Sequence, residues 1–293
     1  MARIIRKVLI LFGVVAALLI LLLILTTLHE PKFVPATMPN PNGYDDLLFA
    51  AQLTTAFPGL GTNQPGLEEL KKTVAQNAEA LQTARRAFSN ECRVLLENPF
   101  GRSLRLGTAP PSFRGLAEAF RVEGRLAELE NRPADAAQSY LAMIRLGQEI
   151  ARGGLLIDAM TASAIESYGL TSLAPLAQFL TAEQCKEVAM LLSAMDAKRE
   201  TVENVVHQEK TWARHTYGWR YYMHPVVNAQ ARHRAGVITV ESDRTRNLMI
   251  TLAACAFELD HGAKPKNMND LVPNYLKTVP KDAFTGRDMT YPP

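Results

Sequence analysis

The longest apolar run of the chain lies at its N-terminus. No residue from Val8 to Leu25 is charged, and two threonines and Leu28 extend the run. At about 1.5 Å per residue, a helix of this length spans roughly 27–31 Å, which is the thickness of a bilayer core. The pattern therefore predicts a transmembrane helix within residues 1–28, with residues 8–28 in contact with the lipid bilayer.

The charges that flank this run predict its orientation. Arg3, Arg6 and Lys7 precede it, and the sequence His-Glu-Pro follows from position 29. Basic residues mark the cytoplasmic side of a membrane, so we expect the N-terminus inside the cytoplasmic (inner) membrane and the rest of the chain outside. A cleaved signal peptide is the alternative. It would have a shorter apolar region that ends in small residues, whereas this run ends in TTLHE, which favours an uncleaved anchor.

Beyond the anchor, apolar residues recur at gaps of three or four, which is the spacing of amphipathic helices. Residues 29–43 contain four prolines and read as a short stiff spacer. Regular periodicity fails across 216–236, and strand patterns are almost absent. The predicted helices cover residues 44–57, 67–97, 113–129, 133–152, 155–173, 182–206 and 240–261.

These elements predict an all-α fold. Aromatic residues make up only 7% of the chain, and apolar residues make up 47%, which is typical of a folded helical protein. We expect a transmembrane helix at 1–28, a spacer at 29–43, and a helical body at 44–240 built from antiparallel hairpins. A long helix and a short irregular C-terminal clasp would occupy 241–293.

The charge balance of the body bears on possible partners. The chain has 32 Lys and Arg residues against 29 Asp and Glu residues, and three of the basic residues precede the anchor. The body therefore carries 29 charges of each sign. Nucleic-acid binding requires an excess of positive charge to neutralise phosphates, so we expect no nucleic acid as a partner.

The cysteines do not form a recognisable motif. Cys92, Cys185 and Cys255 are far apart, odd in number and without a CxxC pair. The favoured interpretation is that all three are small buried hydrophobic residues. One disulfide bridge stays open as an alternative if the body lies outside the cytoplasm.

Histidines crowd the region 200–233 and raise the question of a metal site. Glu200, Glu203 and His207 share one helical face, and His215, His224 and His233 follow. No HExxH motif is present, and the later histidines are eight or nine residues apart, which is not a ligand spacing. No GxSxG, Walker or dinucleotide-binding motif occurs either. The sequence therefore predicts no metal, no cofactor and no catalytic residue.

Aromatic and basic residues gather between positions 211 and 225, where both tryptophans of the chain lie. Such a patch suits a partner protein, a sugar or the lipid headgroup layer, or it closes the end of the bundle core. It is the best candidate for partner binding in the sequence. Its members are Trp212, Arg214, Tyr217, Trp219, Arg220, Tyr221 and Tyr222.

One hairpin resembles a tetratricopeptide-type repeat. Within residues 116–148, the matching aromatic and small positions are Phe120, Gly124, Ala136 and Tyr140. The small residues imply closely approaching helices. The segment departs from the motif at Glu123, Ala127 and Gln148. Only one unit is clear, whereas stacked repeats need about three, so a plain helical hairpin is an equal alternative.

The C-terminal segment has an ordered series of prolines and apolar residues. In residues 244–291, a helix ends in LDHG, a leucine turn follows, and the chain closes on PKDAFTGRDMTY. This segment resembles the C-terminal part of type II secretion major pseudopilins, and also a group of uncharacterised bacterial membrane-anchored helical proteins. It departs from the pseudopilin pattern at Lys264 and Ala283. The N-terminus lacks a prepilin peptidase signal.

In physical terms, this tail predicts a clasp on the last helix. Leu271, Tyr275, Phe284 and Tyr291 supply apolar groups, while three prolines limit the backbone. If the Phe284 ring is fully buried, its replacement by alanine would cost roughly 3–5 kcal/mol.

The leading functional hypothesis is a membrane-tethered extracytoplasmic scaffold or protein-interaction module without catalytic activity, with a protein partner in the cell envelope. The alternatives are an envelope-acting enzyme that uses the region 200–233, and a pseudopilin-like secretion component.

Overall fold

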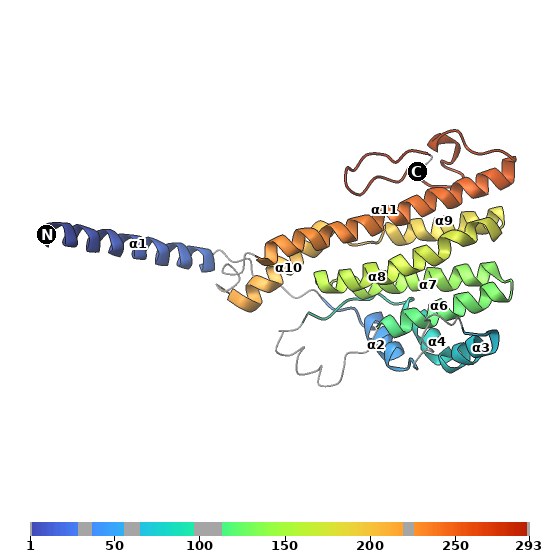
Figure 1. The fold of residues 1–293 in the computed structure, drawn as a ribbon, viewed down its shortest axis with the longest axis horizontal. Helices are drawn as coiled ribbons and strands as arrows, with labels where there is room; N and C mark the ends of the chain where they lie inside the picture. Colours follow the sequence, from blue (N-terminus) through green and yellow to red (C-terminus); the bar gives the residue numbers. More distant parts are fainter. Residues whose placement is uncertain (1, 29–36, 56–64, 97–112, 219–225, 292–293) are drawn as a thin grey trace.

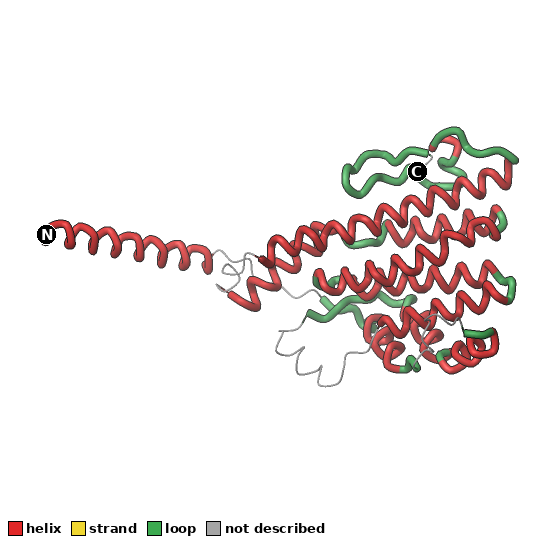
Figure 2. Tube along the Cα trace, viewed as in Figure 1, coloured by secondary structure: helices red, strands yellow, loops and turns green. Residues whose placement is uncertain are grey.

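The fold is all-α, as the sequence predicts. The structure is a computed structural model that describes residues 2–28, 37–55, 65–96, 113–218 and 226–291. Within these ranges the regular elements are helices, and no strand occurs; residues 281 and 288 form one isolated bridge. Figure 2 shows helices joined by loops throughout the described chain.

The first helix, α1 (Ala2–Leu28), extends away from the rest of the molecule (Figure 1). Within the described residues, it is the helix that is long and apolar enough to cross a membrane, by length and composition alone. Its apolar window, Ile5–Leu22, packs against no other part of the protein. A surface of this kind needs an apolar environment.

Three consecutive helices form the centre of the body: α6 (Phe113–Leu129), α7 (Pro133–Ala151) and α8 (Leu156–Leu173). Figure 1 shows α7 lying between α6 and α8. Short turns join them, so neighbours run antiparallel. The first turn has Asn131 in the left-handed region at φ 56° and Pro133 in the first position of α7. The short 3₁₀ helix η1 (Ala174–Phe179) follows α8.

Small residues let these three helices approach closely. A Cβ atom at Gly124 would overlap the ring of Tyr140, which lies across the α6–α7 contact. A Cβ at Gly147 would lie 2.9 Å from the carbonyl oxygen of Ala162 on α8. A Cβ at Gly169 would lie 2.6 Å from Cγ1 of Ile144 on α7. Real side chains do not reach such distances, so the spacing of α7 and α8 depends on glycine on both helices.

The C-terminal half adds α9 (Ala182–Asp196), α10 (Val202–Tyr217) and α11 (Val226–His261). The predicted helix start at residue 182 is confirmed: Thr181 and Gln184 exchange hydrogen bonds and form a capping box at the start of α9. α11 packs along α9 and α8, and it ends at Gly262, whose φ is +68°. The tail then folds back over α11 through the short helix η3 (Met268–Asp270) (Figure 1).

Three short helices complete the body: α2 (Gly43–Gln52), α3 (Leu67–Gln76) and α4 (Ala78–Ala87). They pack against α6, and their buried residues form a second core with α7 around Leu47, Leu81 and Phe120. The larger core lies between α7, α8, α9, α11 and the tail.

The prediction of one continuous helix from position 67 is wrong. The helix is interrupted between α3 and α4 at Asn77, which is almost fully buried. The Asn77 amide donates to the Thr55 hydroxyl and to the Thr73 carbonyl, and its oxygen accepts from the Thr55 backbone. α4 then ends at Ala87, before the predicted end. The hydrogen bonds of Asn77 to distant Thr55 leave the spacing of the apolar residues unchanged, so the sequence pattern did not indicate the interruption.

The long helix predicted from Thr181 to Val206 is also interrupted. α9 ends at Asp196, and Thr201 caps a new helix by accepting from the backbone N–H of Asn204. Leu191, although apolar, is 39% exposed. Further on, helix begins at Val226, although the periodicity predicted irregular structure up to residue 236.

The prediction that the C-terminal segment packs on the last helix is correct for three of its four named residues and wrong for Phe284. Leu271 and Tyr275 are buried against α11, and Tyr291 packs against the same core. The Phe284 ring, in contrast, is 61% exposed. Asp282 accepts backbone bonds from Phe284 and Thr285, which fixes a turn that holds the ring outside. The expectation of a buried Phe284 is therefore wrong.

Candidate functional site: a basic groove

The structure divides the predicted aromatic patch. Trp212 is only 9% exposed and packs with Leu155 and Ala213. Its ring meets Tyr217 edge-on at 6.2 Å, and Tyr217 is 51% exposed. Arg214 is half-buried. Four further members of the patch lie outside the described residues: Trp219, Arg220, Tyr221 and Tyr222. Trp212 thus belongs to the core, and Tyr217 to the surface.

The histidine and glutamate side chains of region 200–233 do not come together at one point within the described residues. Glu200 lies before α10, and its carboxylate accepts from the backbone N–H of Gly153 at 3.0 Å. No group of three or more His, Cys, Asp or Glu side chains is placed to hold a metal in the described ranges. His224 lies outside these ranges, and the side chain of His233 is not described.

The feature that the sequence did not reveal is a surface groove of about 480 Å³ between α4, α7 and α9. We call it the basic groove. Four cationic side chains and a single acidic one line it. The cationic residues are Arg85, Arg145, Arg152 and Lys198, and the acid is Glu149. The apolar lining residues are Phe88, Leu141, Ala142, Leu191, Ala194 and Met195.

Two of the cations are held in place by rings. The guanidinium of Arg85 pairs with Glu123 and lies 5.2 Å from the centre of the Phe120 ring. The guanidinium of Arg145 donates to the Phe88 carbonyl and lies 5.0 Å above the ring of that residue. Such contacts restrict the rotamers of both side chains, so their charges are presented in fixed positions.

The other two cations line one wall of the groove, just beyond the C-terminal ends of α7 and α9. Arg152 donates to the Glu149 carboxylate at 3.1 Å and to the backbone carbonyl of Lys198 at 3.4 Å. Arg145 also approaches Glu149, at 3.8 Å. The ammonium group of Lys198 makes no ion pair or hydrogen bond with any residue in the described part of the chain. Glu149 is therefore shared by two arginines, and the groove keeps an excess of positive charge.

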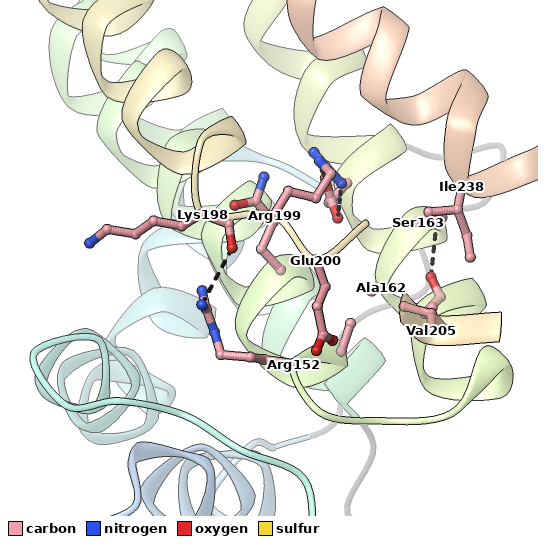
Figure 3. Close-up of a pocket in the computed structure, with 12 residues that line it drawn as sticks. Arg152, Ala162, Ser163, Lys198, Arg199, Glu200, Val205 and Ile238 are labelled. Atoms are coloured by element: carbon pink, nitrogen blue, oxygen red, sulfur yellow. Dashed lines mark hydrogen bonds and ion pairs between the residues drawn. The ribbon is translucent and has the colours of Figure 1, made fainter. Parts of the chain in front are cut away.

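A small cavity of about 30 Å³ lies behind this wall, and Figure 3 shows the residues around it. Gln148, Arg152 and Lys198 border both spaces. In Figure 3 the Lys198 side chain points away from the cavity, and Arg152 reaches the Lys198 backbone. The volume suits about one water molecule, so the cavity is too small for a substrate.

Two ionisable groups below the groove are buried. Cys92 is fully buried, and this burial, helped by Glu149, raises the pKa of its thiol to about 12. A reactive cysteine needs the opposite shift. On the inner side, burial raises the pKa of Glu166, while Arg199 opposes that shift. A surface lined by cationic side chains therefore lies over buried ionisable groups.

One sequence signal for the groove exists in retrospect. Gln138, Ala142, Arg145, Glu149 and Arg152 recur at gaps of three or four along α7, so they share one face of that helix. On its own such a stripe is an ordinary solvated face. Here the stripe borders a groove, to which Arg85 of α4 and Lys198 of the turn after α9 add further cations.

Comparison with known proteins adds no name to this site: no protein-family model, curated protein or solved structure matches the chain. The apolar helix α1 and the basic groove are the two features on which a function rests.

Proposed function

We propose that this protein is a membrane-tethered scaffold, without catalytic activity, that binds an acidic segment of a partner protein in the basic groove. α1 anchors it in the cytoplasmic membrane with the N-terminus inside and the body outside. The partner is a protein of the cell envelope rather than a nucleic acid, since the body as a whole has no excess of positive charge.

Two observations support the tether. The window Ile5–Leu22 is apolar and unpacked in the described structure, so in water it would expose a large apolar surface. Arg6 and Lys7 lie at the N-terminal end of this window, directly before the uncharged run from Val8 to Leu25, on the side that the positive-inside rule assigns to the cytoplasm.

The observation that carries the binding proposal is the local charge of the groove. Four cations line the groove, and two acids contact them: Glu149 in the lining and Glu123, which pairs with Arg85. The groove therefore keeps an excess of positive charge, although the body as a whole is neutral. Complementary charge gives an acidic segment both a faster encounter and a fixed register. Leu141, Leu191 and Met195 add apolar surface between the cations, and such surface supplies affinity when side chains of the partner cover it.

The volume of the groove fits this occupant. About 480 Å³ lies within the usual range of binding pockets, and it holds a few side chains of an extended peptide rather than a folded domain. Exposed residues such as Gln138 and Leu191 line the groove, so a peptide reaches it from solvent without any rearrangement of helices.

The tether is tested by fractionation. The full chain should stay in membranes washed with alkaline carbonate, and a chain without residues 1–28 should be soluble. Externally added protease should digest the body in cells whose outer barrier is opened, but not in inverted inner-membrane vesicles. Digestion in the inverted vesicles alone would contradict the proposed orientation.

The groove is tested with a labelled peptide of about ten residues in which Glu and Leu alternate. The full chain in lipid nanodiscs should bind it, and rising salt should weaken binding. Lys198→Glu should weaken binding by about tenfold, because it reverses a charge that has no partner among the described residues. The matched control is Lys277→Glu, an exposed lysine of the tail with the same change of charge.

Equal binding by the two variants would refute the groove as the site. So would equal binding of a peptide in which Lys replaces every Glu, because the proposal requires selection for negative charge.

A further inference from the structure

Two cysteines from different helices meet at one carbonyl group. Cys185 lies in the first turn of α9, and Cys255 lies in the C-terminal half of α11. The Cys185 sulfur is 3.6 Å from the carbonyl oxygen of Ala177, and the Cys255 sulfur is 3.3 Å from the same oxygen. The two sulfurs are thus separated by no more than the sum of these distances.

The two thiols differ in their exposure to solvent. Cys185 is fully buried in the larger core, whereas Cys255 is half-buried at its edge. Burial and then the adjacent Cys255 thiol raise the pKa of Cys185 to about 12. Cys92 belongs to the other core, among residues of α2, α4 and α6. The pair is therefore selective: two of the three thiols are neighbours, and the third is remote.

We propose that Cys185 and Cys255 form a reversible disulfide that joins α9 to α11 when the protein meets a disulfide donor. The half-buried Cys255 loses its proton and attacks the donor, which gives a mixed disulfide and one free donor thiol. The Cys185 thiolate then attacks the Cys255 sulfur and expels the second donor thiol. Two protein thiols are oxidised, one donor disulfide is reduced to two thiols, and both protein protons leave to solvent or to the donor.

The bridge would act on a defined part of the fold. It closes a loop of about 70 residues that contains most of α9, all of α10 and most of α11. Closing such a loop removes conformations from the unfolded chain and so stabilises the folded one. α9 lines the basic groove, while α11 carries the tail, so the bridge would lock these two surfaces together. The geometry of the pair does not depend on the proposed function or on the compartment.

The test uses the full chain in detergent micelles. The protein is equilibrated with oxidised glutathione, unfolded in denaturant with iodoacetamide, and weighed by mass spectrometry. We expect one alkylated thiol, Cys92, and three after reduction. The bridge should raise the melting temperature by about 5–10 °C. Cys92→Ala should keep the bridge, whereas Cys185→Ala and Cys255→Ala should each abolish it.

Three alkylated thiols in the equilibrated wild-type protein would overturn the proposal. A bridge that involves Cys92 would overturn it as well. The two single variants provide independent tests, because Cys255 is only half-buried and its replacement by alanine leaves Cys185 packed.

Discussion

Arg199 and Glu166 form a two-pronged ion pair inside the protein. The Nη2–Oε2 distance is 2.6 Å and the Nη1–Oε1 distance is 3.1 Å. Arg199 comes from the break between α9 and α10, and it also contacts Asp196, which in turn pairs with Arg246 of α11. Ion pairs therefore connect the segment between α9 and α10, where the predicted long helix is interrupted, to α8 and α11.

Removing the cation of this pair should be costly. In Arg199→Met, Glu166 keeps its buried position without a partner, so we expect a loss of roughly 3–5 kcal/mol in the free energy of unfolding. Urea denaturation followed by circular dichroism measures it. The control is Arg132→Met, whose exposed pairs with Glu130 and Asp135 should contribute at most about 1 kcal/mol. Equal losses in both variants would show that Glu166 does not need its partner.

A buried carboxyl group on α11 should give a characteristic pH dependence. Burial raises the pKa of Glu241 above its ordinary value of 4.5, and Arg244, 2.9 Å away, only partly offsets this. The folded state then binds the proton more tightly than the unfolded state. The stability that this group contributes is full below about pH 4.5 and is lost as the pH rises through the folded pKa.

Glu241→Gln removes this titration. We expect the variant to gain stability relative to wild type at pH 7, and the difference to shrink as the pH falls towards 4.5. Urea unfolding at a series of pH values checks it. A difference that grows on acidification would mean that the folded pKa is lowered instead.

The contact between α6 and α7 should not tolerate a methyl group. In Gly124→Ala the new Cβ would lie 2.7 Å from Cζ of Tyr140, which must move, although its hydroxyl donates to Glu128. We expect a loss of about 1–3 kcal/mol in thermal or urea unfolding. Gly236→Ala is the matched control, since nothing lies within 4 Å of its Cβ, and it should stabilise α11 by up to about 1 kcal/mol. Similar effects at both positions would rule out the close contact.

The tail should be held by Leu271 rather than by Phe284. Leu271 is fully buried against α11, so Leu271→Ala should cost about 2–5 kcal/mol. Phe284→Ala should change the free energy of unfolding by less than about 0.5 kcal/mol, because the ring is mostly in water. Differential scanning calorimetry compares the two. A large loss in Phe284→Ala would mean that this ring is covered.

Local signals predicted where most helices begin and end. The capping box at Thr181, the turn before Pro133 and the stop at Gly262 were all visible in the sequence, because each depends on one or two neighbouring residues. The breaks at Asn77 and at residues 197–201 were not visible. Both are produced by side chains that bind distant parts of the chain, and the apolar pattern continues across them.

The basic groove was beyond prediction for a related reason. Arg85 comes from α4, Arg145 from α7 and Lys198 from the turn after α9, and each reads as an ordinary surface charge in its own segment. The aromatic patch, in contrast, was conspicuous in sequence, yet burial of Trp212 places one of its largest rings in the core. The sequence shows which side chains are aromatic or charged. It does not show which distant segments the fold brings together.

The glycines at the close contact between α7 and α8 have an evolutionary consequence. Gly147 and Gly169 face opposite helices, so replacing either one would push the pair apart and disturb Ile144 and Glu166 on the two sides of the contact. Natural drift should therefore leave these two positions unchanged in descendants of this chain, while Gly218 and Gly286, which have open space around them, are restrained only by their backbone angles.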